Sequence, residues 1–359
     1  MKLHCIPILS ALFTSLVCFS NPATKISDNS PSSGIVIRWN DCEQTIDGFG
    51  IAQAGWAKEL FAFKNRKQVM DKMFGNDGLR LNILRGEIFP HYWENKEDKD
   101  FNLNDDINIE LCDSDFNNKS DDLLRRGQLW LTLEAKNKYH INKLVFSTWS
   151  APAWMKSNGK VSNGKLKPEC YQDFANYLAA FYKAYKSKGI TPYAISPSNE
   201  PGYAAPWNSS LWTADEMGKF ITSNLGPTFQ KENIPAKIIF GENPLWSVVM
   251  PQLKMVSSKD FTDTILQDYP EIKKFNLIAA GHGYSLSPDI MPIKVDKEYL
   301  KTPIIPFDAA EKAHIPVWIT EISDVTPLDT SIQDGLKWAV TFHNYLTKAN
   351  VNAILWWGG

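Results

Sequence analysis

The sequence predicts an α/β fold in which eight parallel strands alternate with helices and close into a (β/α)8 barrel. Three observations predict it. Short apolar stretches recur eight times, longer amphipathic stretches separate them, and polar or aromatic side chains stand where several short stretches end. Strands that alternate with helices pair in parallel, because each crossover helix returns the chain to the same end of the sheet.

The predicted strands are short runs rich in β-branched and aromatic residues, bounded by turn residues. They span residues 47–53, 79–86, 143–149, 192–199, 237–242, 275–282, 316–321 and 351–357.

Helical periodicity fills several of the intervals. Apolar residues three or four positions apart predict a helix over 169–188, which Gly189 ends. Thr213 and Glu216 form a capping-box pattern at the start of a helix over 213–231. Two further stretches, 121–138 and 331–349, are also helix-like, and two long polar or proline-rich stretches, 88–120 and 283–306, are predicted to be loops.

A closed barrel and an open doubly wound sheet both fit this alternation. Six predicted strands end in a side chain suited to a binding or catalytic site. These residues are Arg85, Trp149, Glu200, His282, Glu321 and Trp357. A closed barrel brings all strand ends to one mouth, whereas an open sheet spreads them along an edge. The barrel is therefore favoured.

The N-terminus is predicted to direct export. Lys2 precedes an apolar stretch that is too short to span a bilayer, and small residues stand at the cleavage positions before Asn21. We therefore expect a signal peptide over 1–20, a linker over 21–34, and a secreted, extracellular protein (periplasmic in a Gram-negative source). The alternative interpretation of 1–20 is a buried N-terminal helix.

Composition narrows the partners. The chain has 359 residues and a formal net charge of −2, which gives no support for binding to nucleic acid or to an anionic membrane surface. No later stretch is predicted to span a membrane. Cys42, Cys112 and Cys170 follow the signal peptide without CxxC spacing, which argues against a zinc site or a disulfide scaffold. We expect a monomer.

Two strand-end carboxylates suggest the chemistry. Glu200 ends the fourth strand and Glu321 the seventh, so a barrel can place them across one mouth. Two facing acids are what cleavage of a glycosidic bond needs, since one protonates the leaving oxygen and the other attacks or stabilises the anomeric carbon. For a lone glutamate, a surface or ion-pair role would be the better interpretation. Tryptophans near the strand ends are suited to stacking on sugar rings.

Five motifs, taken in order, resemble those of glycoside hydrolase family 30, whose members act on xylan, β-1,6-glucan, β-1,6-galactan and glucosylceramide. They are QTIDGFG (44–50), STWSAPAWMKSNG (147–159), ISPSNEP (195–201), GHGY (281–284) and WITEIS (318–323). The resemblance implies a (β/α)8 barrel and a retaining reaction that needs neither a metal nor an organic cofactor.

The resemblance also implies roles for single residues. Glu200 matches the general acid/base and Glu321 the nucleophile, while Asn199 matches the ligand of the 2-hydroxyl at the scissile sugar. Five further residues match positions around that sugar, and they are Arg85, Trp149, His282, Tyr284 and Trp357. Trp356 competes with Trp357 for the last position.

One departure from the family pattern concerns domain organisation. Family members carry a β-sandwich beside the barrel, and residues 35–45, with GIVIRWN at 34–40, are expected to supply its N-terminal strand. The barrel is expected over 46–359, where the sequence stops just after the eighth strand, so the sandwich would be incomplete. A non-catalytic carbohydrate-binding protein is the alternative from a different functional class.

The substrate follows from details of the same motifs. The ISPSNEP form of the acid/base motif is more similar to polysaccharide-acting members than to glucosylceramidases. Xylan is therefore the expected substrate, with β-1,6-linked glucan or galactan next and a lipid-linked glucoside third. An α/β oxidoreductase is disfavoured, because GFGIAQAG (48–55) lacks the third glycine of a dinucleotide loop.

Overall fold

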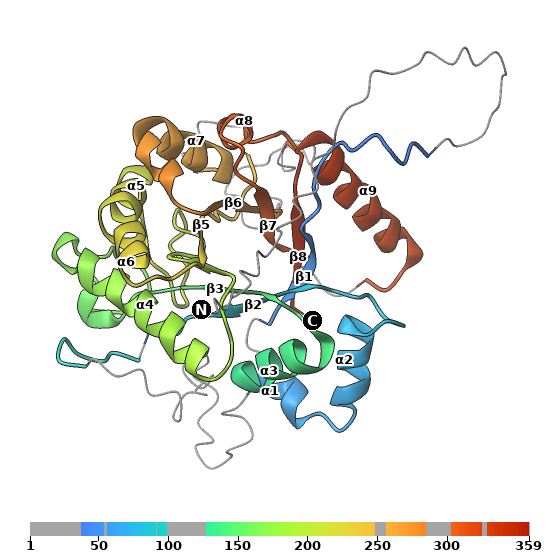
Figure 1. Cartoon of the computed structure of the whole chain (residues 1–359), viewed down its shortest axis with the longest axis horizontal. Coiled ribbons are helices and arrows are strands. Elements are labelled where there is room, and N and C mark those ends of the chain that lie inside the picture. Colours follow the sequence, from blue (N-terminus) through green and yellow to red (C-terminus); the bar gives the residue numbers. More distant parts are fainter. Residues whose placement is uncertain are drawn as a thin grey trace, which may run out of the picture. The chain divides into compact units, whose positions relative to one another are not determined.

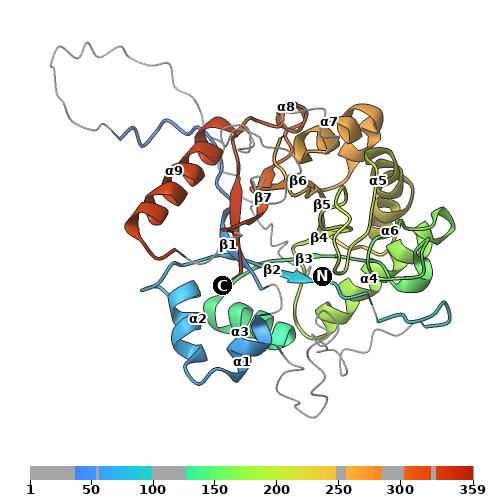
Figure 2. The ribbon, with the colours of Figure 1, turned by 180° about the vertical axis from the view of Figure 1, so that it is seen from behind.

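The structure is a computed structural model, which describes residues 37–53, 56–90, 92–98, 127–247, 256–284, 303–324 and 329–358. Two units are distinguished, residues 1–43 and 44–359. The second unit is the barrel. Figure 1 shows its strands as a ring with the helices outside, and Figure 2 shows the same ring from behind.

All eight predicted strands form, and each pairs in parallel with its sequence neighbours, β8 closing onto β1. The strands are β1 (Gly48–Ala52), β2 (Ile83–Glu87), β3 (Lys143–Ser147), β4 (Ala194–Ser196), β5 (Lys237–Gly241), β6 (Leu277–His282), β7 (Val317–Ile322) and β8 (Ala353–Trp357). The predicted closed barrel is therefore confirmed, and the open sheet is excluded.

Helices cover the outside of the strands. They are α1 (Ala57–Ala62), α2 (Arg66–Phe74), α3 (Gly127–Tyr139), α4 (Tyr171–Ser187), α5 (Ala214–Phe220), α6 (Gly226–Lys231), α7 (Ser258–Asp268), α8 (Asp308–Lys312) and α9 (Ile332–Lys348). The predicted helix over 213–231 has a capping box at Thr213 but contains a π-helical turn at Ile221–Leu225. Pro227, which follows that turn, has no N–H to continue an α-helical ladder.

Two apolar layers hold the barrel together. Its interior is filled by residues that alternate along the strands, among them Ile83, Val145, Ile278 and Trp318. A larger layer lies between the strands and the helices, where residues such as Phe146 of β3 pack against α4. The same alternation continues toward the carboxyl end of each strand. A residue two positions after an interior apolar residue therefore points into the mouth of the barrel.

The described part of the predicted N-terminal strand differs from expectation. Residues 37–40 belong to no strand, and Trp39 and Asn40 form a turn, while 34–36 lie outside the described residues. A strand needs a neighbouring strand to accept its backbone hydrogen bonds, and 37–40 pair with none in the described chain. The predicted signal peptide, linker and most of the 88–120 and 283–306 loops also lie outside the described residues.

Two remaining sequence expectations concern membranes and cysteines. Among the described helices, none combines the length and the apolar character needed to cross a membrane. Cys42 and Cys170 are free thiols, and Cys112 lies outside the described residues.

Candidate active site

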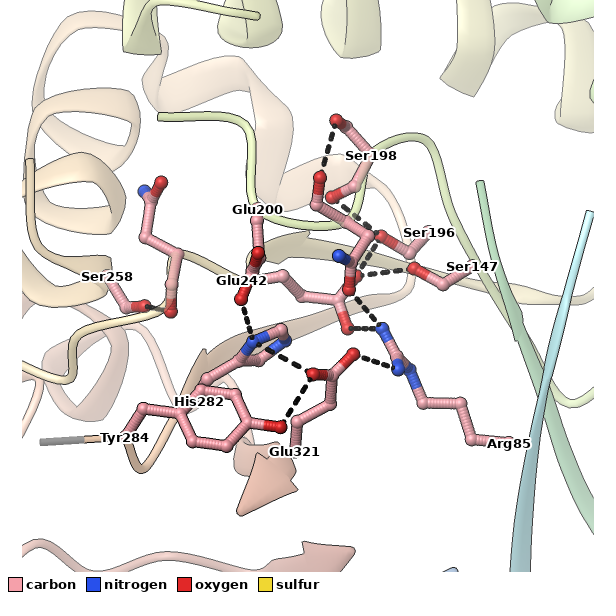
Figure 3. A network of polar contacts seen from close by, with 12 residues as sticks. Arg85, Ser147, Ser196, Ser198, Glu200, Glu242, Ser258, His282, Tyr284 and Glu321 are labelled. Carbon is pink, nitrogen blue, oxygen red and sulfur yellow. Dashed lines mark hydrogen bonds and ion pairs between the residues drawn. The ribbon is translucent and has the colours of Figure 1, made fainter. Parts of the chain in front are cut away.

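Six of the eight predicted site residues meet in one polar network at the mouth of the barrel, formed by the carboxyl ends of the strands (Figure 3). They are Arg85, Asn199, Glu200, His282, Tyr284 and Glu321. The two tryptophans lie beside them: the Arg85 guanidinium stands 4.8 Å from the Trp149 ring centre, and the Trp149 and Trp357 ring centres are 5.8 Å apart.

Strand alternation explains how several of these side chains reach the mouth. Arg85 lies two positions after the interior residue Ile83, and His282 lies two after Ala280. Trp357 lies two after the interior residue Leu355, whereas Trp356 faces α9 and packs against Trp338. The alternation thus assigns the inward position to Trp357.

Glu321 does not follow that alternation. Trp318 points into the barrel, so strict alternation along β7 would turn the side chain of Glu321 toward the helices and that of Ile322 inward. Instead the register between β7 and β8 shifts between Ile319 and Ile322, and Ile322 packs in the outer layer. An irregularity of this kind re-aims side chains, and here it leaves the Glu321 carboxylate facing the mouth.

The two glutamates are close together and almost completely buried. Glu200 is 9% exposed and Glu321 is 3% exposed. A carboxylate oxygen from each, together with a His282 ring nitrogen, lie within 4.8 Å of one another. Oxygens this close fit the carboxyl separation of about 5–5.5 Å that is typical of retaining glycosidases.

Glu321 is held by donors on both oxygens. Arg85 Nη1 donates to its Oε1 at 2.5 Å, and the Tyr284 hydroxyl donates to its Oε2 at 3.1 Å. Burial raises the pKa of the Glu321 carboxyl, while the charges of His282 and Arg85 oppose that rise. Burial, reinforced by the carboxylates of Glu321 and Glu200, raises the pKa of Tyr284, so its hydroxyl stays a donor.

His282 bridges the two glutamates. Its Nδ1 lies 3.1 Å from Glu200 Oε1 and 3.4 Å from Glu321 Oε2. Burial disfavours the charged ring, but Glu321 and Glu200 outweigh it and raise the pKa of His282. A protonated ring here places its N–H between two carboxylates.

Asn199 faces the network from the segment just after β4. Its Oδ1 accepts from Arg85 Nη2 at 2.8 Å, and its backbone N–H donates to Thr148 O at 2.7 Å. Because Arg85 occupies the oxygen, the amide nitrogen is the part of the side chain left to donate to a ligand.

The glutamate pair and His282 also have the geometry of a metal-ligand group within the described residues. Arg85 opposes such a use, since its positive charge lies 2.5 Å from Glu321 and competes for the oxygen that a cation would take. The arrangement is suited to proton transfer by one glutamate and nucleophilic attack by the other.

A third buried carboxylate was missed by the sequence prediction. Glu242, directly after β5, is fully buried and accepts hydrogen bonds from Ser147 Oγ at 2.8 Å and from Ser196 Oγ. It also pairs with Arg85 Nη2 at 3.2 Å. Burial favours its neutral form, but Arg85 and His282 outweigh that effect and hold the pKa of Glu242 below its ordinary value. The only sequence signal was that it ends a predicted strand, as Glu200 and Glu321 do.

Comparison with known proteins identifies the family of the chain. The model of O-Glycosyl hydrolase family 30 matches residues 32–359. The chain belongs to glycoside hydrolase family 30. The resemblance found in the sequence motifs is thereby confirmed.

Relatives of the chain are named for different activities. "Putative glucosylceramidase 3" of Caenorhabditis elegans is 30% identical over 251 residues, covering 67% of this chain and 45% of the relative. Glucuronoxylanase XynC of Bacillus subtilis is 26% identical over 232 residues, covering 62% of this chain and 47% of the relative. The chain therefore spans about half the length of these relatives.

A solved family 30 structure has the same fold. The catalytic domain of xylanase C from Talaromyces cellulolyticus matches with a TM-score of 0.65 at 23% identity, covering 88% of this chain and 68% of that one.

Proposed function

We propose that this protein is a secreted, retaining β-glycoside hydrolase that cleaves a polysaccharide, with xylan as the lead substrate. The observation that carries the proposal is the buried pair of Glu200 and Glu321, with carboxylate oxygens within 4.8 Å. Of these two glutamates, it is Glu321 that accepts hydrogen bonds from Arg85 and Tyr284. Membership of family 30 supports the same class of reaction.

The reaction proceeds in two displacements. Glu321 attacks the anomeric carbon while Glu200 protonates the leaving oxygen, and a covalent glycosyl-enzyme forms. Glu200 then removes a proton from water, which attacks the same carbon and releases the sugar. Arg85 and Tyr284 donate to Glu321, so they stabilise its charge before the attack and after release.

Exposed aromatic rings near Glu200 support a carbohydrate polymer as substrate. Tyr203 and Trp207 lie on the loop after Glu200, are 39% and 52% exposed, and have ring centres 6.2 Å apart. Flat apolar rings stack on the C–H faces of sugars. Since Glu200 protonates the leaving group, this loop is suited to hold the leaving sugar residues.

Two observations favour xylan over the alternative substrates. The acid/base motif ISPSNEP resembles polysaccharide-acting members, and a relative and a solved structure are named as a glucuronoxylanase and a xylanase. β-1,6-linked glucan and galactan follow as the next candidates. A lipid-linked glucoside is the third, and the relative at 30% identity, which carries a glucosylceramidase name, supports it.

The test is hydrolysis by the full chain of aryl β-xyloside, aryl β-glucoside, glucuronoxylan, β-1,6-glucan, β-1,6-galactan and glucosylceramide. We expect glucuronoxylan to be cleaved fastest, with a first-formed product of β configuration by ¹H NMR. Glu321→Ala should lose turnover by about 10⁴-fold or more, because the nucleophile is gone. A first product of α configuration, or near-wild-type rates in that variant, would contradict the mechanism. Binding of glycan with no turnover of any substrate would favour the carbohydrate-binding alternative.

A further inference from the structure

Glu242 contacts both halves of the proposed catalytic machinery, although neither alternation nor the motif resemblance marked it. We propose that Glu242 is a positioning residue that holds Glu200 through its main chain and Glu321 through Arg85. This proposal rests on the proposed function of the two glutamates.

The main chain of Glu242 fixes the position of Glu200. The backbone N–H of Glu200 donates to the carbonyl of Glu242 at 3.0 Å, and the N–H of Glu242 donates to Ala280 O at 2.8 Å. Both glutamates have left-handed backbones, with φ of 45° for Glu200 and 35° for Glu242. Such a conformation is costly for a residue with a side chain and persists only where its surroundings enforce it.

The side chain of Glu242 acts on Glu321 through the fork of Arg85. Arg85 Nη2 is shared by Glu242 and Asn199, and Nη1 donates to Glu321. A guanidinium is planar and rigid, so fixing one nitrogen fixes the direction of the other. Ser147 and Ser196 hold the other oxygen of Glu242, so this carboxylate is itself anchored from two neighbouring strands.

Charge adds a second effect. The titratable groups around Glu242 are Arg85 on β2, His282 and Tyr284 at the end of β6, Glu321 on β7 and Glu200 after β4. Two carboxylates that share one buried arginine compete for its charge. Removing the charge of Glu242 leaves Arg85 to Glu321 alone, which makes ionisation of Glu321 easier.

Glu242→Gln tests this coupling. It keeps the size of the side chain and an oxygen that can accept hydrogen bonds from the two serines, but it removes the charge. We expect the carboxyl ¹³C titration of Glu321, assigned with Glu321→Gln, to move down by about one pH unit. We also expect the acidic limb of the pH profile of kcat/KM to move in the same direction. At the pH optimum, kcat/KM should fall by about 10- to 100-fold, because Arg85 loses the carboxylate of Glu242 that fixes its orientation.

Two further variants separate position from charge. Glu242→Asp keeps the charge but withdraws the carboxylate by one methylene, so the Glu321 titration should stay near wild type while kcat/KM falls. Asp47→Asn is the matched control, because it removes a partly buried charge at the opposite end of the barrel, where Asp47 accepts from Trp318 Nε1. It should leave the titration of Glu321 unchanged.

The outcomes distinguish the two proposals. An unchanged Glu321 titration and a kcat/KM within twofold of wild type in Glu242→Gln overturn the positioning role. If Glu242→Gln does not fold, full kcat/KM in Glu242→Asp overturns it. If wild-type protein hydrolyses no substrate but Glu242→Gln still shifts the titration, the proposed function fails and the coupling of Glu242 to Glu321 stands.

Discussion

Lys156 offers a sharp test of how a buried charge contributes to stability. It follows the third strand and has no solvent exposure, and its ammonium donates to Ser150 Oγ at 3.1 Å and Ser209 O at 2.7 Å. Burial lowers the pKa of Lys156 from 10.5 to about 7. The residue therefore links the loops after β3 and β4, which carry Trp149 and Glu200.

The direction of the pH effect follows from proton counting. Between pH 7 and pH 10.5 the unfolded chain keeps the proton on Lys156 and the folded chain has lost it, so the free energy of unfolding rises with pH. Below pH 7 both states are protonated and the cost of the buried charge is fully present. One pKa unit corresponds to about 1.4 kcal/mol, so the gain between pH 7 and pH 9 is about 2 kcal/mol.

The measurement compares wild type with Lys156→Met by urea unfolding at pH 6, 7, 8 and 9. Taking the difference in the free energy of unfolding cancels the other titrating groups. We expect this difference to be nearly constant from pH 6 to 7 and then to rise in favour of wild type by about 2 kcal/mol by pH 9. Lys188→Met, at an exposed position, should give a flat difference. A flat or falling difference for Lys156→Met would refute the reasoning.

Three further predictions follow from single contacts. Tyr284→Phe removes the donor to Glu321 Oε2, so the acidic limb of the pH profile should move up by about half a unit or more, and an unmoved limb would count against that bond. Trp207→Ala should raise KM for xylan by roughly tenfold, because stacking of the exposed ring on a sugar is lost, while KM for an aryl xyloside stays unchanged. Equal effects on both substrates would argue against a contact between Trp207 and the polymer. Gly241→Ala should lower the free energy of unfolding in urea by about 2 kcal/mol or more. The φ angle of Gly241 is 107°, and a Cβ at this position would lie 2.2 Å from Ala280 O. Wild-type stability in this variant would contradict the prediction.

Local sequence patterns were enough to predict the barrel and most of the residues at its mouth. Eight apolar runs and their intervening helices predicted the strand order, and strand alternation is local enough to carry Arg85, His282 and Trp357 from sequence to the interior face. Glu200 and Glu321 were found because each stands at the end of a predicted strand and because the surrounding motifs resemble a family. Several helices, α7 among them, were not predicted, and α1 and α2 are short and owe their place to packing against α3.

The directions in which the acidic side chains point depend on long-range contacts. Period-two alternation puts Glu242 on the outer face with Phe240, yet left-handed backbones at Gly241 and Glu242 turn it inward to Arg85. A register shift between β7 and β8 does the same for Glu321. Such local departures depend on hydrogen bonds to neighbouring strands that lie far away in sequence, so no local pattern records them. The physical reason is that a single carboxylate is stable in this interior only when partners from several strands surround it.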